Sequence, residues 1–133
     1  MKPKLLIIDD EEAILFAGEA YFTGRGYAVD CARERRDAEV LLEHNCGSGA
    51  CYTAVIADLR IRGVSDTEGL DILAYVKKRC PSALRILLTA YGSPEIERRA
   101  CELSIDILLH KPKPLAEIAQ ILSGFIPQRS LKL

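Results

Sequence analysis

Residues 5–10, Leu-Leu-Ile-Ile-Asp-Asp, place a short apolar run directly before two carboxylates. A run of this length, rich in Leu and Ile, is typical of a buried strand in a parallel sheet. Three later apolar runs have the same form and end at or beside Asp58, Thr89 and Lys111. In an open parallel sheet, ligands bind at the carboxyl ends of the strands. We therefore expect three carboxylates, a hydroxyl and an ammonium group to meet in one crevice.

Segments with helical spacing of apolar residues lie between these runs. In the first of them the expected inward stripe is Ala13, Ile14, Ala17 and Tyr21, and in the last it is Leu115, Ile118, Ala119 and Leu122. Five strands alternating with five helices predict an α/β fold, a flavodoxin-like doubly wound five-stranded parallel sheet with strand order 2-1-3-4-5. The strand expected at residues 27–31 has no functional cluster at its end, which suits its edge position in that order.

The composition favours one domain with its own core. The chain has 133 residues, 49% of them apolar, and a net charge of -1, so nothing draws it strongly to nucleic acid or to anionic lipid. No apolar run is long enough to span a membrane, and the first strand is too short to be the core of a signal peptide. We expect a cytoplasmic protein with a domain at residues 1–127, followed by a tail or the start of a linker at 128–133.

The cysteines are predicted to be free thiols, because their number is odd and the expected compartment is reducing. They are Cys31, Cys46, Cys51, Cys80 and Cys101. A loop could bring Cys46 and Cys51 together, and His44 is the only further metal ligand near them in sequence. A disulfide or a metal site at that loop is the less favoured alternative.

Asp9, Asp10 and Asp58 cannot all stay ionised in one crevice without cost, because like charges at close range raise one another's pKa or require a cation. Mg²⁺ is a hard ion that binds one or two carboxylates together with water and phosphate oxygens. Asp58 stands alone at the end of the predicted central strand and is the candidate nucleophile for a phosphoryl group. Asp10 would bind the metal directly, and Asp9 directly or through water. Lys111 and Thr89 would contact the phosphoryl oxygens.

Each of these side chains also has an ordinary structural interpretation. Asp9 or Asp10 could cap the first helix. Asp58 and Thr89 could be turn residues, and Lys111 could be a solvated surface charge. All of these interpretations would have to hold together for the crevice to have no chemical role.

The order of these residues resembles the response-regulator receiver domain of two-component signalling systems, over essentially the whole chain. The resemblance is carried by the acid pair Asp9-Asp10, the lone Asp58, Thr89-Ala90 and Lys111-Pro112. It implies that Asp58 accepts a phosphoryl group from a sensor histidine kinase or a histidine phosphotransfer protein, with Mg²⁺ as cofactor. It also implies that the backbone carbonyl of Arg60 joins the three aspartates as a metal ligand, and that the Lys111–Pro112 peptide bond is cis.

In such a domain phosphorylation changes a partner-binding surface, so the resemblance implies a switch and no enzyme beyond assistance to its own phosphorylation and dephosphorylation. The expected surface is formed by the fourth helix, fifth strand and fifth helix, and it would serve an effector or a second copy of the chain, with no direct nucleic-acid or membrane partner. Its charged residues are Arg98, Arg99, Asp106, Lys113 and Glu117.

Two other functions remain open on the sequence. A Mg²⁺-dependent phosphohydrolase that turns over an aspartyl-phosphate generally has a second Asp two residues after the nucleophile, where this chain has Arg60. A receiver-like docking module that is never phosphorylated would not need the complete set of acidic, hydroxyl and lysine positions.

The chain departs from the family pattern at several positions. Leu108 stands where receiver domains usually have an aromatic, three residues before Lys111. The segment after Asp58 is longer than the family's common form. It could alter partner choice or access to the phosphoryl group, or it could be a tolerated surface insertion. Arg60 and Tyr91 take positions that in the family influence how long the phosphoryl group survives, and their bulk predicts slow self-hydrolysis. Arg60→Asn and Tyr91→Glu should therefore speed the decay of the phosphorylated form, and unchanged decay in both variants would contradict this expectation.

Overall fold

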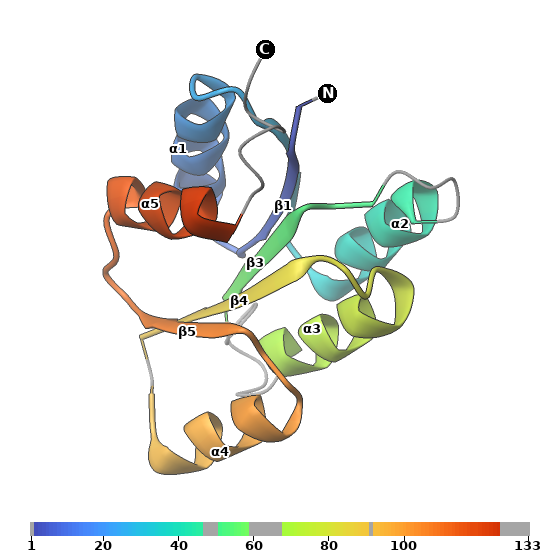
Figure 1. Ribbon diagram of the computed structural model, residues 1–133, viewed down its shortest axis with the longest axis vertical. Coiled ribbons are helices and arrows are strands. Elements are labelled where there is room, and N and C mark those ends of the chain that lie inside the picture. The colour runs from blue at the N-terminus through green and yellow to red at the C-terminus, as the bar shows by residue number, and fades with distance from the viewer. Residues whose placement is uncertain (1, 47–50, 59–67, 91, 126–133) are drawn as a thin grey trace.

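A computed structural model describes residues 2–46, 51–58, 68–90 and 92–125 (Figure 1). The strands are β1 (Lys4–Ile8), β2 (Ala28–Ala32), β3 (Ala54–Asp58), β4 (Leu84–Thr89) and β5 (Ile107–His110). The helices are α1 (Glu12–Thr23), α2 (Arg35–Asn45), α3 (Glu68–Arg79), α4 (Pro94–Glu102) and α5 (Leu115–Phe125).

The strands form one parallel sheet in the order β2-β1-β3-β4-β5, which confirms the predicted fold class. The register aligns Ile8 with Ala57 and Thr89 with His110. The carboxyl ends of β1, β3, β4 and β5 consequently lie along one edge of the sheet.

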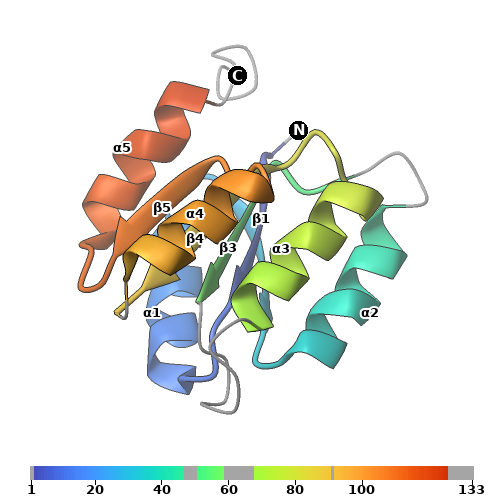
Figure 2. The ribbon, with the colours of Figure 1, turned by 90° about the horizontal axis from the view of Figure 1, so that it is seen from below.

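Helices cover both faces of the sheet. Figure 1 and Figure 2 show α1 and α5 on one face and α2, α3 and α4 on the other. Alternate strand residues supply the two cores: Leu6, Val55 and Leu87 pack on the α2–α4 side, and Leu5, Ile56 and Ile86 on the α1–α5 side. Both sides of the central strands are therefore dry, which explains why their sequences are continuously apolar.

The predicted inward stripe of α1 is confirmed only in part: Ile14 and Tyr21 are half-buried, and Tyr21 packs against the core on the α1–α5 side. Ala13 and Ala17 are exposed, whereas Leu15, Gly18 and Phe22 are buried. A Cβ atom at Gly18 would lie 3.0 Å from Ile7 Cδ1, so the missing side chain lets the helix lie close on β1. A prediction from the spacing of apolar residues misses a buried glycine such as Gly18, because glycine has no apolar side chain to count.

The expectation of free thiols also needs a correction. Cys51 and Cys80 form a disulfide with a Cα–Cα distance of 6.0 Å, while Cys31, Cys46 and Cys101 are free. The pairing arises because the residue after α3 lies against the chain that enters β3. The sequence suggested Cys46 as the partner of Cys51, since those two are close along the chain.

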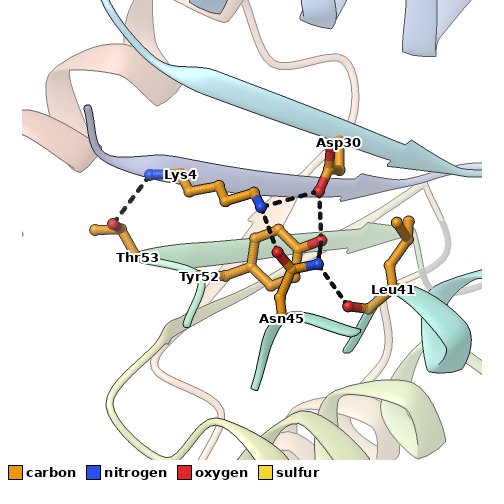
Figure 3. A network of polar contacts seen from close by, with 6 residues as sticks. All are labelled: Lys4, Asp30, Leu41, Asn45, Tyr52 and Thr53. Atoms are coloured by element: carbon orange, nitrogen blue, oxygen red, sulfur yellow. Dashed lines mark hydrogen bonds and ion pairs between the residues drawn. The ribbon is translucent and has the colours of Figure 1, made fainter. Parts of the chain in front are cut away.

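A polar network ties α2 to the sheet at the end opposite the carboxyl edge of β3 (Figure 3). Tyr52 donates to Asp30 Oδ2 at 2.6 Å, and Asn45 Nδ2 donates to Tyr52 Oη at 3.0 Å. Lys4 Nζ donates to Asn45 Oδ1 and lies 3.6 Å from Asp30 Oδ2. Because these polar groups satisfy one another, the first strand, the second strand and the end of α2 are held in one arrangement.

Candidate functional site

The predicted site residues converge at the carboxyl edge of the sheet. Asp9 and Asp10 directly follow β1, Asp58 ends β3, Thr89 ends β4 and Lys111 directly follows β5. Each parallel strand delivers its next polar residue to the same edge, so side chains more than a hundred positions apart in sequence meet there. The fold therefore brings the predicted site residues to one end of the sheet.

The three carboxylates form one compact group of oxygen donors. One carboxylate oxygen from each of Asp9, Asp10 and Asp58 lies within 4.8 Å of the others. Asp9 is 2% exposed and Asp58 is 8% exposed, so water screens their repulsion poorly. Close, partly desolvated carboxylates are the donor set of a hard divalent cation, and these residues fit Mg²⁺.

Lys111 supplies the positive charge of the site. Its Nζ donates to Asp9 Oδ2 at 3.0 Å and lies 3.4 Å from Asp58 Oδ1. Burial lowers the pKa of this ammonium group, but the bond to Asp9 and the charge of Asp58 outweigh it, so the pKa is raised overall. The Lys111 N–H donates to Thr89 O at 2.8 Å, and the Lys111–Pro112 bond is cis, as the resemblance implied.

Asp9 links the site to the first helix. Its Oδ1 accepts the N–H of Glu11 at 3.0 Å, and Glu11 is the N-cap residue of α1. Asp9 is therefore not the N-cap residue, because it lies two positions before Glu11, which has no side-chain cap; its second oxygen accepts from Lys111. The Asp9 carboxylate therefore positions both the start of α1 and the side chain of Lys111.

The carboxyl group of Asp58 has a strongly raised pKa. Burial raises its pKa from 3.8 to about 6; Lys111 opposes this shift and the charges of Asp9 and Asp10 add to it. A folded-state pKa above the ordinary value means that the folded chain holds this proton more tightly than the unfolded chain does. The contribution of Asp58 to the stability of the metal-free protein should therefore fall as the pH rises from about 3.8 to about 6, and this loss is complete above that range.

This shift predicts that Asp58→Asn stabilises the metal-free protein at neutral pH, by about 2 kcal/mol, because the amide carries no charge to desolvate. Urea unfolding in the presence of a chelator measures the difference, with the exposed Asp37→Asn as the matched control. The gain should vanish in acid near the ordinary pKa of Asp. A variant no more stable than wild type at neutral pH would contradict the prediction.

Of the residues predicted to modulate the site, Leu108 lies within the described part of the chain. Leu108 is half-buried and packs against the core on the α2–α4 side, where Ile96 and Ala100 of α4 also lie. Thr89, which was predicted to contact the phosphoryl oxygens and not to modulate the site, is fully buried. Arg60 and Tyr91, and the long segment after Asp58, lie outside the described residues.

One contact beside the site was missed from the sequence. A Cβ atom at Gly92 would lie 2.5 Å from His110 Cε1, so the imidazole ring occupies the space that any side chain at position 92 would need. This contact joins the segment after β4 to the end of β5. A glycine three residues after Thr89 was the available signal, but nothing in the sequence identified its neighbour.

Comparison with known proteins decides the family. The chain matches the family described as "Response regulator receiver domain" over residues 5–123. It belongs to this family. The receiver domain is 30% identical to the transcriptional regulatory protein PmrA of Pectobacterium parmentieri over 86% of this chain and 48% of PmrA. It spans smaller shares of other relatives, such as 22% of the alginate biosynthesis regulator AlgB of Pseudomonas putida.

Solved structures agree with the fold of this receiver domain. A receiver domain protein from Clostridium thermocellum is 27% identical, with a TM-score of 0.80 over 98% of this chain and 99% of that one. A Burkholderia pseudomallei response regulator, 23% identical, has a TM-score of 0.75 over 96% of this chain and 68% of that one. Its crystal structure contains a phosphorylated aspartic acid, a calcium ion and citrate.

Receiver domains of response regulators generally act as signalling switches that interact with histidine kinases and effectors, and not as enzymes. They typically bind Mg²⁺ at their acidic pocket. In the described part of this receiver domain, no helix has both the length and the apolar character needed to cross a bilayer.

Proposed function

We propose that this receiver domain is a phospho-accepting switch in which Asp58 receives a phosphoryl group from a histidine kinase or a histidine phosphotransfer protein. The observation that carries the proposal is the placement of Asp58, a buried carboxylate grouped with two further carboxylates and 3.4 Å from the Lys111 ammonium. Phosphoryl transfer depends mainly on positioning and on neutralising charge, and this edge of the sheet offers both.

In the proposed reaction an oxygen of Asp58 attacks the phosphorus of the donor. The new O–P bond forms as the bond between phosphorus and the donor nitrogen breaks, and the imidazole leaves with the electron pair. Lys111 is held by Asp9 and is placed to neutralise a phosphoryl oxygen, and Thr89 contributes a hydroxyl at the next strand end. Bound Mg²⁺, held by Asp9, Asp10, Asp58 and the carbonyl of Arg60, would neutralise charge on the transferred group.

The same contacts suggest how the signal reaches a surface. Phosphorylation replaces the single negative charge of the Asp58 carboxylate by the nearly two negative charges of a phosphate, so the two carboxylate contacts of Lys111 must be redistributed. Lys111 follows β5, and Thr89 precedes the segment that leads to α4. We propose that this biases the α4–β5–α5 surface between two arrangements and so selects an effector or a second copy of the chain. Leu108, without the usual aromatic ring, would transmit this change through its packing near α4.

The ligands of the Burkholderia pseudomallei regulator support the chemistry, because that protein holds an aspartyl phosphate and a divalent cation. The proposal places this chain in the cytoplasm as a receiver domain at residues 1–127, with 128–133 as a tail or the start of a linker. Arg60 and Tyr91 are proposed to slow the loss of the phosphoryl group.

The decisive experiment is incubation with acetyl phosphate, with and without Mg²⁺, followed by intact-mass measurement. One phosphoryl group per chain should appear only with Mg²⁺, and hydroxylamine should remove it, as expected for an acyl phosphate. No incorporation with Mg²⁺ would overturn the proposal in favour of a docking module. Sustained release of phosphate from small phosphate esters would instead favour the phosphohydrolase.

A further inference from the structure

A second group of potential metal ligands lies at the opposite end of the sheet from the carboxylates. The Sγ atoms of Cys46, Cys51 and Cys80 lie within 4.8 Å of one another. Cys46 follows α2, Cys51 precedes β3 and Cys80 follows α3, so three separate elements deliver these sulfurs to one place. The carboxylate site does not use them.

We propose that these cysteines, once the Cys51–Cys80 disulfide is reduced, bind a thiophilic divalent cation of the Zn²⁺ class through three thiolates. Zinc–sulfur bonds are about 2.3 Å long, so sulfurs on one tetrahedral ion are about 3.8 Å apart. All three sulfurs lie within 4.8 Å of one another, so Cys46 Sγ is already near that spacing, and the Cys51 and Cys80 sulfurs would separate to it once their bond is reduced.

The helix ends around the cluster favour a cation over bare thiolates. Cys46 is the C-cap residue of α2, and Cys80 follows the last residue of α3. The carboxyl ends of helices carry partial negative charge, which stabilises a nearby cation and opposes an uncompensated anion. The carbonyl oxygens of Tyr52 and Arg79 also lie near the sulfurs, 3.6 Å from Cys80 Sγ and 3.9 Å from Cys51 Sγ.

The backbone around the cluster is already held in place. The residues beside Cys46 and Cys51, Asn45 and Tyr52, are hydrogen-bonded to each other within the network of Figure 3. Three thiolates on a divalent ion leave one net negative charge. The Arg79 guanidinium, which also pairs with Glu43 at 2.9 Å, partly offsets the burial that raises the pKa of the Cys46 thiol. Arg79 Nε is buried and has no hydrogen-bond partner within the described residues.

Metal binding and the disulfide exclude each other. A dithiol reductant opens the disulfide by giving two electrons to the sulfurs and becomes a disulfide itself, and the metal then displaces the thiol protons. A small-molecule disulfide that accepts two electrons from the Cys51 and Cys80 thiolates, and is itself reduced to two thiols, re-forms the S–S bond and releases the ion with its charge unchanged. Reducing conditions would therefore favour the metal-bound form.

The test uses the full chain, reduced with a phosphine under anaerobic conditions and freed of reductant, with Co²⁺ as the probe and Mg²⁺ in excess. Sulfur-to-cobalt charge-transfer absorption reports thiolate ligation and is not produced by carboxylates. We expect one Co²⁺ per chain, displacement by Zn²⁺, and loss of binding after oxidation with a disulfide-forming reagent. Asp58→Asn should bind equally well, which separates this site from the proposed phosphorylation site.

The variants identify the ligands. Cys46→Ser changes a half-buried thiol outside the disulfide, so the fold should survive, and its affinity for Co²⁺ should fall about tenfold or more. Cys101→Ser, an exposed cysteine on α4, is the matched control and should bind like wild type. Absence of the charge-transfer band, unchanged binding by Cys46→Ser, or a disulfide that resists reduction in the folded chain would each overturn the proposal.

Discussion

Asp58→Asn is expected to take up no phosphoryl group from acetyl phosphate and Mg²⁺ under conditions that label the wild-type chain. The amide has nearly the same shape as the carboxylate but lacks its negative charge and is a much weaker nucleophile. The fall in labelling rate should be about a hundredfold or more, measured by intact mass over time. Because the variant should also be the more stable protein without metal, unfolding would not explain the loss.

Two matched variants make this result specific. Asp37→Asn removes an exposed carboxylate in the first turn of α2, far from the site, and should be labelled at the wild-type rate. Asp10→Asn tests the other possible acceptor at the same edge. Labelling that persists in Asp58→Asn but disappears in Asp10→Asn would move the phosphoacceptor from β3 to the segment after β1.

The fold and the grouping of the site residues could be predicted because they depend on features close together in sequence. Strands buried on both faces are continuously apolar, as residues 5–8 and 54–57 are. Once the strands are parallel, the residue that follows each one is delivered to the same edge. The proximity of Asp9, Asp58 and Lys111 follows from that rule, without knowledge of any individual contact.

The failures concern contacts that depend on how close two elements approach. Gly18 faces β1 because it lacks a side chain, so a search for apolar residues shifted the inward face of α1. Cys51 and Cys80 are 29 residues apart, and their meeting depends on where α3 ends relative to β3. Arg85 is a buried arginine on β4 that donates hydrogen bonds to backbone carbonyls of neighbouring elements. The sequence could not predict this role, because a charged residue in a strand does not indicate which carbonyl groups lie within its reach.

Arg85→Met is expected to lower the free energy of unfolding by about 3 kcal/mol. Arg85 lies on β4 and is only 3% exposed. Its Nη1 lies 3.3 Å from Leu73 O and 3.2 Å from Leu103 O, and Nη2 donates to Ser104 O. Methionine fills much of the same volume but donates to none of these carbonyls, so buried acceptors on α3 and at the end of α4 lose their partner. Urea unfolding measures the change in the free energy of unfolding. The dependence of that free energy on urea concentration, the m-value, should equal that of wild type.

The exposed Arg36→Met serves as the control and should change stability by less than about 0.5 kcal/mol. Arg85→Lys keeps the charge but offers a single ammonium group to carbonyls that come from α3 and from the end of α4, so it should recover only part of the loss. Since Leu103 is the C-cap residue of α4 and Ser104 follows it, the methionine variant should also speed hydrogen exchange in that helix. A stability change below about 1 kcal/mol would mean that water replaces the guanidinium at these carbonyls, and that Arg85 does not anchor α4.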